Sequence, residues 1–456
     1  MKKSRNCSEK AYREKVGAIF NRFPSVQQVG FEDAYKPGLE HMRAFATVLG
    51  NPQEAFRTVH VAGTNGKGSV SSMLASVLAG PGCRVGLYTS PHLLDFRERM
   101  RIVGGARPEA DEAEGMIPKE YVYDFLCRYE ADMDRLRLSF FEITTGMAFK
   151  WFADAGVELA VIEVGLGGRL DSTNILVPEL SIVTTIGLDH CAQLGNTLAA
   201  IAGEKAGIFK KDVPALVGEA VSETRPVFET KAAGLCPLTF AQDAEPSLWP
   251  RHAGILARMD LQGKYQEKNL RTVLTAVDLL RTLPGFEALS DDGRVADALE
   301  RTAARTGFHG RWERVSARPL MLADIGHNPQ ALAENFAQLK QMLKDGTCAT
   351  LIIVYAVMAD KDLDGILPLL PEDAAYIFTQ PAIPRALPVS QLEARYRSFC
   401  ARTGRQQDRI HAVPTVREAL DLALRLAAGS PRPLVYVGGS AYLVAEALPI
   451  LRARKA

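Results

Sequence analysis

A short glycine-punctuated stretch, HVAGTNGKGSV at residues 60–70, constrains this chain more than any other part of the sequence. β-forming residues at 57–62 run into a glycine-rich turn, and a helix-compatible segment begins by Ser69. A loop between a strand and a helix start turns backbone N–H groups toward an anion. Lys67 adds a mobile positive charge. The order of strand, loop, lysine and helix predicts a phosphate cradle for a nucleotide, ATP in the first place.

The stretch departs from the strict P-loop pattern in two places. Val61 stands where the pattern has its first glycine, and Gly68 separates Lys67 from Ser69. A glycine-rich turn that binds no ligand would give the same local signal. If the loop binds a nucleotide, the residues around the phosphates are Gly63, Thr64, Asn65, Gly66, Lys67, Gly68 and Ser69.

The composition excludes several other classes of protein. The chain has 456 residues, which is too long for one ordinary core and predicts two or three domains. Its net charge of +1, from 54 basic and 53 acidic residues, argues against a general nucleic-acid surface. Seven scattered cysteines without a CxxC pair indicate free thiols in a reducing compartment. With neither a secretory signal nor an apolar run of membrane-spanning length, we expect a cytoplasmic protein that binds no membrane.

Strand-like and helix-like runs alternate along most of the chain, and they do so in two series. Continuous apolar runs such as 158–164 and 180–186 suit strands that are buried on both faces of a parallel sheet. The alternation starts again near 320, after RTGFHGR interrupts the pattern. We therefore predict an α/β protein: a P-loop ATP-binding domain with a parallel-rich sheet flanked by helices at 1–308, followed by a smaller Rossmann-like α/β domain at 309–456. Residues 11–50 are expected to be mainly helical and 104–118 a loop.

Three predicted strands of the first domain end next to residues that bind metals. Ser90 follows the strand at 83–88, Glu163 ends the next, and His190 stands after Asp189 beyond the strand at 180–186. The carboxyl ends of parallel strands meet at one edge of a sheet. A hydroxyl, a carboxylate and an imidazole there suit Mg²⁺, which keeps its remaining ligands as waters and phosphates. A salt bridge from Glu163 to Arg169 and a purely structural histidine remain the plain alternatives.

Several motifs in order along the chain resemble one enzyme family. GTNGKGS is similar to the loop of the ATP-dependent amide-forming ligases, which include folylpolyglutamate synthase, dihydrofolate synthase and the muramyl peptide ligases. The segment SPHL…F.ER at 90–99 and YQ..N at 265–269 resemble the folate branch of that family. So do EKAGI at 204–208, DIGHNP at 324–329 and GGSAYLVAE at 438–446.

The resemblance implies metal and substrate sites in the first domain. Ser90, Glu163 and His190 would bind Mg²⁺. Lys205 of EKAGI would be carbamylated, which turns a cation into a carboxylate-like ligand for a second Mg²⁺; read alone, it is a solvated lysine. The loop that carries His92 and Arg97 would border the pterin substrate. A requirement for K⁺ is left open.

The same resemblance assigns roles nearer the domain junction. Asn269 would read adenine, although capping of its helix explains it equally well, and Gln266 and Asn269 could face one way. Arg311 would reach the phosphates when the domains close. Asp324 and His327 would position the incoming glutamate or the nucleotide. The family form is DGAHNP, so Ile325 and Gly326 depart from it. Ser440 with Tyr442, at a strand-to-helix turn, would bind a carboxylate.

The function that the resemblance implies is a dihydrofolate synthase and folylpolyglutamate synthase acting as a monomer. ATP would phosphorylate a carboxylate of dihydropteroate or of a folate, and the amine of L-glutamate would displace the phosphate, with His327 a candidate to handle the amine proton. Three alternatives stay open: a muramyl peptide ligase, a P-loop NTPase that acts as a switch, and a non-catalytic nucleotide- or folate-binding protein. The sequence leaves undecided whether one or both folate reactions occur.

Overall fold

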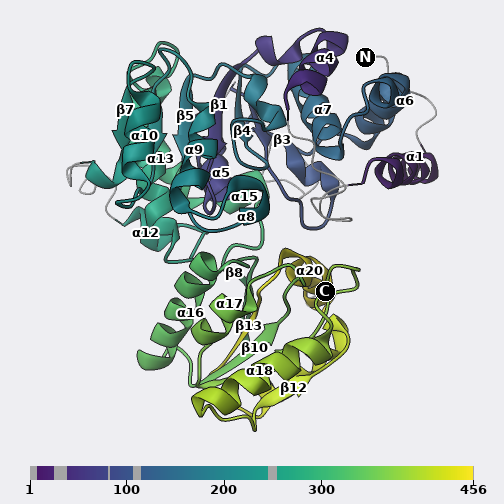
Figure 1. Ribbon diagram of the computed structural model, residues 1–456, viewed down its shortest axis with the longest axis vertical. Helices are drawn as coiled ribbons and strands as arrows, with labels where there is room; N and C mark the ends of the chain where they lie inside the picture. Colours follow the sequence, from purple (N-terminus) through teal and green to yellow (C-terminus); the bar gives the residue numbers. More distant parts are fainter. Residues whose placement is uncertain (1–7, 25–37, 81–82, 106–114, 245–253, 455–456) are drawn as a thin grey trace. The chain divides into compact units, whose positions relative to one another are not determined.

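The computed structural model describes residues 8–24, 38–80, 83–105, 115–244 and 254–454. The chain divides into two compact units (Figure 1). The first comprises Met1–Asp260 and Gln266–Phe308, and the second comprises Leu261–Tyr265 and His309–Ala456. The short segment Leu261–Tyr265, which the sequence analysis assigned to the first domain, is thus part of the second unit.

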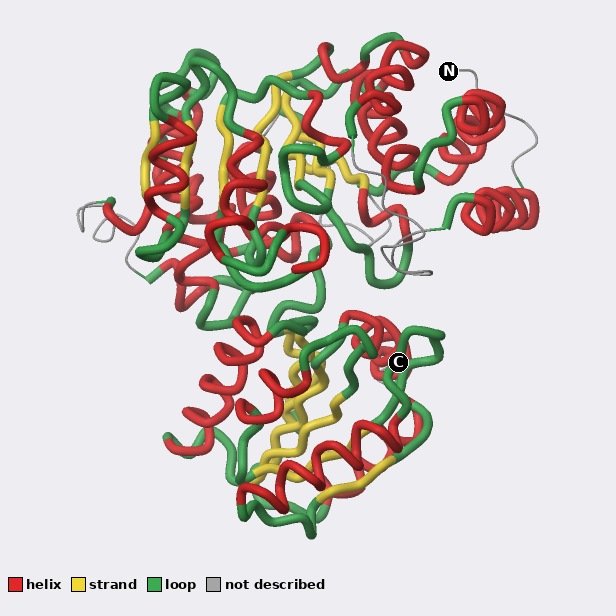
Figure 2. Tube along the Cα trace, viewed as in Figure 1, coloured by secondary structure: helices red, strands yellow, loops and turns green. Residues whose placement is uncertain are grey.

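The first unit is built on a seven-stranded sheet with the order β3-β2-β4-β1-β5-β6-β7. All neighbouring strands run parallel except β2 and β3. The central strands are buried along nearly their whole length, because helices cover both faces of the sheet (Figure 2). The strands are β1 Arg57–Ala62, β2 Val85–Tyr88, β3 Met100–Val103, β4 Leu159–Glu163, β5 Leu180–Val183, β6 Ala215–Val217 and β7 Leu238–Phe240.

Buried hydrophobic side chains from the strands and the helices form the core between this sheet and its helices. An aromatic-rich cluster includes Phe45, Phe149 and Phe152, and a second, mainly aliphatic cluster includes Ile201 and Val217. The helices are α1 Glu9–Arg22, α4 Glu40–Leu49, α5 Lys67–Leu78, α6 Lys119–Arg135, α7 Phe140–Asp154, α8 Cys191–Leu194, α9 Leu198–Lys205, α10 Arg225–Ala232, α12 Ile255–Arg258, α13 Gln266–Leu280, α14 Asp292–Glu300 and α15 Thr302–Thr306. Helix α5 packs against β1, β2 and β4, at the centre of the sheet.

The second unit contains a six-stranded sheet with the order β12-β11-β10-β13-β9-β8. Only β8 and β9 pair antiparallel. The strands are β8 Glu313–Ala317, β9 Leu320–Asp324, β10 Thr350–Tyr355, β11 Ala374–Phe378, β12 Ile410–Ala412 and β13 Pro433–Gly438. The helices are α16 Pro329–Lys344, α17 Leu363–Ile366, α18 Val389–Thr403, α19 Val416–Ala428 and α20 Ala441–Ala453. Gly438 pairs with Asp324, so the ends of β13 and β9 lie side by side.

The predicted α/β class with two parallel-rich sheets is confirmed, and the differences lie at the edges. The sequence analysis missed β3, β7, β8 and β12, which are short strands near or at the sheet edges and, in β7 and β8, only partly buried. Such strands lack the continuous apolar run that marks a central strand. Of the helical stretch expected at 11–50 and the loop expected at 104–118, residues 25–37 and 106–114 lie outside the described residues.

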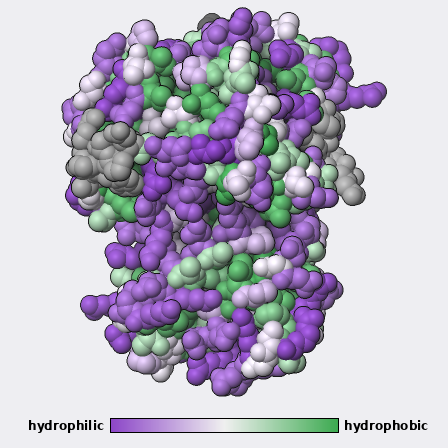
Figure 3. Space-filling view, turned by 60° about the vertical axis from the view of Figure 1, so that its left-hand side comes forward, coloured by the Kyte–Doolittle hydropathy of each residue, from purple (hydrophilic) through white to green (hydrophobic). Residues whose placement is uncertain are grey.

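The described surface carries only isolated apolar side chains. The large exposed hydrophobics come from separate segments, namely Val48, Leu94, Val177, Leu188 and Val221. Hydrophilic residues lie between hydrophobic ones over the face seen in the space-filling view (Figure 3). Among the described helices, none has both the length and the apolar composition needed to cross a membrane.

Candidate active site

The glycine loop of the first unit connects the end of β1 to the start of α5. Gly63 and Gly66 have positive φ angles of 147° and 87°. A Cβ on Gly63 would lie 1.9 Å from the hydroxyl oxygen of Thr184, and one on Gly66 would lie 2.3 Å from Oδ1 of Asn269. Only glycine therefore fits at these two positions. The helix begins at Lys67, two residues earlier than the sequence predicted, which places the lysine on its first turn.

The loop is also tied to the segment that follows β5. Thr64 Oγ1 accepts a hydrogen bond from the Gly187 amide over 3.0 Å and lies 3.1 Å from the Gly187 carbonyl oxygen. The Thr184 hydroxyl donates to the Asn65 carbonyl oxygen over 2.6 Å. The glycine loop and the segment leading to His190 therefore form one hydrogen-bonded layer at the carboxyl edge of the sheet.

Two lysines meet on the backbone of the loop. Lys67 Nζ donates to the carbonyl oxygens of Gly63 and Thr64 over 3.0 and 3.2 Å. Lys205 Nζ, from the end of α9, donates to the same Gly63 oxygen over 2.8 Å. Lys205 is 4% exposed, and its burial, together with the charge of Lys67, lowers its pKa to about 7. A large fraction of Lys205 side chains is therefore neutral near physiological pH.

Glu163 and Ser90 lie together at the ends of the adjacent strands β4 and β2. The Ser90 amide donates to Glu163 Oε2 over 3.0 Å, and Glu163 is 2% exposed. The same oxygen lies 3.8 Å from where a Cβ of Gly68 would be, so the carboxylate stands beside the first turn of α5. Arg169, the partner suggested for Glu163, forms a salt bridge with Glu204 over 2.9 Å.

These residues suit a divalent cation. A buried carboxylate beside a phosphate-binding loop would repel phosphates unless a cation stood between them. His190 follows the Gly187 segment with φ 53°, and its Nε2 lies 3.9 Å from Asp189 Oδ2. The described residues contain no cluster of three His, Cys, Asp or Glu side chains. A site here would thus need the Ser90 hydroxyl, waters and phosphates as further ligands.

The loop expected to border the pterin is rigidly organised. Glu98 accepts hydrogen bonds from the amides of Leu93, Leu94 and Asp95. Arg97 Nη2 lies 2.7 Å from Asp95, so its guanidinium already has a partner. His92 Nδ1 accepts from Arg99 Nε over 2.9 Å, and burial with the adjacent Arg99 charge holds the pKa of His92 well below its usual value. His92 is therefore neutral, with its proton on Nε2.

Gln266 and Asn269 on α13 face one way, as predicted, and they also form a hydrogen bond with each other. Asn269 Nδ2 donates to Gln266 Oε1 over 2.8 Å, and Gln266 Nε2 donates to the Ser69 hydroxyl over 3.2 Å. Both side chains are buried. Gln266 thus hydrogen-bonds the loop at Ser69, and Asn269 lies against it at Gly66.

The sequence analysis missed a buried chain of hydrogen bonds beneath the loop. His60 Nε2 lies 2.8 Å from the Thr173 hydroxyl, which donates to Asp171. Asp171 in turn accepts from the Leu166 amide over 2.8 Å. This chain links β1 to the GLGGRLDSTN turn after β4. Its members are a histidine inside an apolar run and an aspartate within a turn, which leave no spacing signal in the sequence.

The residues predicted in the second unit gather at the carboxyl edge of its sheet. Asp324 ends β9, His327 follows it, and Ser440 follows Gly438, the partner of Asp324 in β13. Ser440 accepts from the Tyr442 amide over 3.1 Å and caps α20. The Gly310 carbonyl oxygen accepts from the Ile325 amide over 3.0 Å, which brings Arg311 to the same edge.

The ring of His327 is oriented by its own loop. Its Nδ1 lies 3.0 Å from the Ile325 carbonyl oxygen. A carbonyl oxygen can only accept, so Nδ1 carries the proton and Nε2 carries the lone pair in the neutral ring. The loop with the changed residues Ile325 and Gly326 therefore still orients the His327 ring through a backbone carbonyl.

Comparison with known proteins agrees with this geometry. The family model for the Mur ligase, glutamate ligase domain matches residues 310–441. Folylpolyglutamate synthase from Lacticaseibacillus casei is 30% identical over 451 residues, which cover 95% of this chain and 96% of that protein. Dihydrofolate synthase/folylpolyglutamate synthase from Mycobacterium tuberculosis is 31% identical over 423 residues, with 87% and 84% covered.

Solved structures show the same fold over nearly the whole chain. Folylpolyglutamate synthase of Mycobacterium tuberculosis, complexed with ADP and AMPPCP, superposes with a TM-score of 0.79 at 26% identity, covering 97% of this chain and 99% of that one. The bifunctional folylpolyglutamate synthase/dihydrofolate synthase of Yersinia pestis, complexed with AMPPNP and a Mn ion, gives 0.75 at 26% identity, with 96% and 98% covered.

The fold and the nucleotide loop, together with the glutamate ligase domain, define an ATP-dependent ligase that joins an acid to an amino acid. The motifs of the folate branch and the curated relatives narrow this class further. The chain belongs to the folylpolyglutamate synthase/dihydrofolate synthase family.

Proposed function

We propose that this enzyme adds L-glutamate both to dihydropteroate and to tetrahydrofolate or folylpolyglutamate, as a monomer in the cytoplasm. A monofunctional folylpolyglutamate synthase is the second candidate, since the first relative carries that name alone. In either case a substrate carboxylate oxygen attacks the γ-phosphorus of ATP and ADP leaves. The glutamate nitrogen then attacks the acyl carbon, phosphate leaves, and the nitrogen loses a proton.

The observation that carries the proposal is the glycine loop with Lys67 on the first turn of α5 and Glu163 beside Gly68. Phosphoryl transfer depends on positioning and charge neutralisation more than on a protein nucleophile. Lys67 and the loop amides of Gly63–Ser69 would hold the phosphates. In its present position Lys67 donates to carbonyl oxygens of its own loop, and we infer that ATP draws it away from them.

Ser90, Glu163 and His190 are the residues that would hold Mg²⁺, as the donor types at this edge of the sheet suggest. The ion, when bound, neutralises charge on the transferred phosphoryl group. The presence of Mn with AMPPNP in the Yersinia pestis relative supports a divalent cation. The buried position of Glu163 supports it independently.

Lys205 fits the expected carbamylation for a chemical reason. Only a neutral amine attacks CO₂, and a pKa lowered to about 7 provides that form. The product carries a negative charge next to Lys67, where the ammonium form would be repelled. Carbamylated Lys205 would then serve as a ligand of a second Mg²⁺. A K⁺ requirement has no support in the described geometry.

The remaining residues are assigned by their local chemistry. Asn269, next to Gly66, is proposed to read adenine, and Arg311 to neutralise phosphate charge. His327, with its lone pair on Nε2, is proposed to take the proton of the attacking amine, and Ser440 to bind a glutamate carboxylate. His92, a neutral donor at Nε2, and Arg97 are proposed to face the pterin. Asp324 would position the backbone of Trp312 and Gly326, whose amides donate to its carboxylate.

The test is phosphate release by the purified protein with Mg-ATP and L-glutamate, with dihydropteroate and tetrahydrofolate in separate reactions. Release with both, together with glutamyl products identified by mass, is the expected result. Release with one substrate alone assigns a monofunctional enzyme. Release that needs no pterin contradicts the proposal and favours an NTPase.

A further inference from the structure

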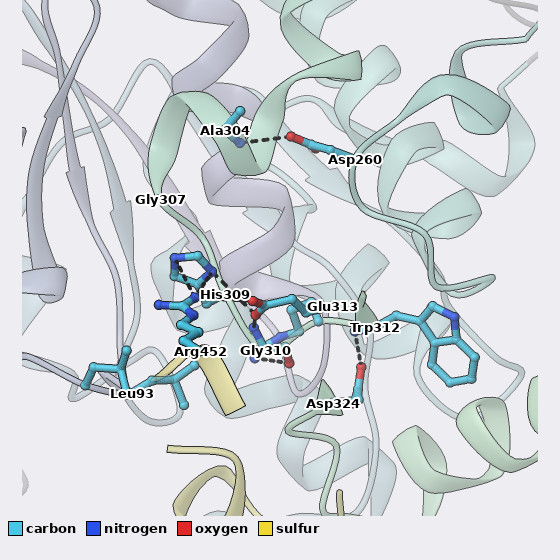
Figure 4. Close-up of polar contacts among 12 residues, drawn as sticks. Leu93, Asp260, Ala304, Gly307, His309, Gly310, Trp312, Glu313, Asp324 and Arg452 are labelled. Carbon is cyan, nitrogen blue, oxygen red and sulfur yellow. Dashed lines mark hydrogen bonds and ion pairs between the residues drawn. The ribbon is translucent and has the colours of Figure 1, made fainter. Parts of the chain in front are cut away.

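In the second unit, the side chain of Asp324 accepts hydrogen bonds from both segments that connect this unit to the first, residues 261–265 and 309–312. The chain passes between the units after Asp260, after Tyr265 and after Phe308. Within the second unit, the Tyr265 hydroxyl donates to Asp324 Oδ2 over 2.7 Å. The amide of Trp312 donates to the same oxygen over 2.8 Å, as Figure 4 shows. Asp324 therefore joins the segments 261–265 and 309–312.

The other oxygen of Asp324 is equally engaged. Oδ1 accepts from the Gly326 amide and from Asn335 Nδ2, each over 2.7 Å. Asp324 is 2% exposed. A carboxylate has about four lone-pair directions, so four donors fill its capacity. Its part in the reaction is therefore to hold protein segments in place, while contact with the nucleotide or glutamate falls to other groups.

Tyr265 is a dependable donor in this cluster. Burial, and then the neighbouring charge of Asp324, raise its pKa well above the usual value. The hydroxyl keeps its proton and donates at every accessible pH. The rest of its segment is hydrogen-bonded to Gln338: the Lys264 amide donates to Gln338 Oε1 over 2.8 Å, and Gln338 Nε2 donates to the Gln262 carbonyl oxygen over 3.4 Å.

In the first unit, the residues just beyond the chain crossings pack against the nucleotide loop. Gln266 donates to Ser69, and Asn269 lies against Gly66. The ring of Phe308 lies 3.1 Å from where a Cβ of Gly68 would be. The crossing at Asp260 is fixed as well, because its carboxylate accepts from the amides of Ala303 and Ala304 at the start of α15 (Figure 4).

We propose that Tyr265 is a positioning residue for the amide-forming step, acting through Asp324. Its hydroxyl fixes the segment that joins the glutamate ligase unit to α13, the helix that contacts the nucleotide loop. This inference rests on the proposed ligase function. Tyr265 makes no described hydrogen bond to the loop residues, so we expect ATP binding and acyl phosphate formation to continue without its hydroxyl.

Loss of the hydroxyl changes the fate of the acyl phosphate. Trp312 still donates to Asp324 in the Tyr265→Phe variant, so the backbone next to Arg311 stays in place. Glutamate is then presented less accurately, and water competes for the acyl carbon. Attack by water returns the carboxylate and releases phosphate, so ATP is consumed without an amide.

The experiment measures phosphate released per glutamyl product formed, in the full-length wild type and in Tyr265→Phe. We expect a ratio near one for the wild type and an increase of about two- to tenfold in the variant, the range for one lost hydrogen bond. The dissociation constant of ADP should be unchanged. The matched control is Tyr436→Phe, which removes another buried hydroxyl, 3.0 Å from Asn335 Nδ2, and keeps the ring that packs against Trp312.

The outcomes separate the two proposals. If the wild type forms no glutamyl product, the proposed function fails. If the wild type releases about one phosphate per glutamyl product and Tyr265→Phe keeps that ratio, the inference is wrong. A lower rate at the same ratio does not rescue it, because lower stability reduces phosphate release and amide formation together. An equal rise in Tyr436→Phe also overturns it, since any disturbance of the second unit's core would then suffice.

Discussion

Lys67 and Lys205 donate to one acceptor, the carbonyl oxygen of Gly63, over 3.0 and 2.8 Å. Burial in the first place, and repulsion by the charge of Lys67 in the second, lower the pKa of Lys205. Carbamylation removes this repulsion because it changes the sign of one charge. The proposed carbamate would therefore place opposite charges, in place of like charges, at Lys67 and Lys205.

We expect Lys205→Ala to lower kcat/KM by on the order of 100-fold, because it removes a charge that organises phosphoryl transfer. A short carboxylate such as acetate should restore part of the rate by occupying the vacated space. The measurement is the steady-state rate with and without acetate.

Lys210→Ala is the control for this prediction. Lys210 also has a lowered pKa from burial, but its Nζ donates to the Asn174 carbonyl oxygen and does not meet the loop. The steady-state rate of Lys210→Ala should not rise when acetate is added. Full activity of wild-type enzyme in which mass spectrometry finds Lys205 unmodified would contradict the carbamate.

The glycine loop can be tested by adding a single methyl group. Gly66→Ala places a Cβ against Asn269 Oδ1 and also strains a residue with φ 87°. We expect ADP affinity to fall at least tenfold and the free energy of unfolding to fall by about 1–3 kcal/mol. Gly404→Ala is the matched control: its φ is 71°, but nothing lies within 4 Å of the new Cβ. It should cost only the backbone strain, about 1 kcal/mol, and leave ADP affinity unchanged.

The sequence predicted the parts of the site that lie directly after strands. Ser90, Glu163 and the glycine loop each follow a continuous apolar run, and the parallel sheet brings such ends together. It could not reveal partners chosen by tertiary packing. The bond between Tyr265 and Asp324 spans 59 positions. Tyr265 directly precedes helix α13 and Asp324 ends strand β9, so no local sequence pattern links the two residues.

The edge strands were missed for a related physical reason. Strand β8 has one buried position, Val315, between exposed and partly exposed ones, and β3 is only four residues long. Their existence depends on the neighbouring strand, since an isolated short strand has too little apolar surface to form alone. Arg169 illustrates the same limit for charges. The sequence suggested Glu163 as its partner, and the structure pairs it with Glu204, which lies 35 positions away.

The metal site can be tested at Glu163. Glu163→Gln removes the charge but keeps an oxygen that can accept from the Ser90 amide, so the turn should stay folded. We expect the Mg²⁺ concentration for half-maximal rate to rise at least tenfold and kcat to fall on the order of 100-fold. Mg²⁺ titration of the rate checks this. An unchanged Mg²⁺ dependence would remove Glu163 from the metal site.

The last prediction concerns pH and the buried His60. It is 0% exposed, its Nδ1 has no hydrogen-bond partner among the described residues, and burial, with the charge of Lys210, lowers its pKa to about 3. Below the usual pKa of 6.5, His60 is protonated in the unfolded chain but stays neutral in the folded chain. The free energy of unfolding therefore falls as the pH drops from 6.5 toward 3, by about 2–3 kcal/mol over the first two pH units.

The measurement is urea unfolding of the wild type and of His60→Gln at several pH values between about 6.5 and 4.5. Glutamine can still donate to Thr173 but cannot be protonated in this range. Other groups titrate alike in both proteins, so the difference between the two curves isolates His60. We expect the wild type to lose stability more steeply as the pH falls. Parallel curves would mean that His60 takes up its proton in the folded state and that the chain from His60 to Asp171 tolerates a charge.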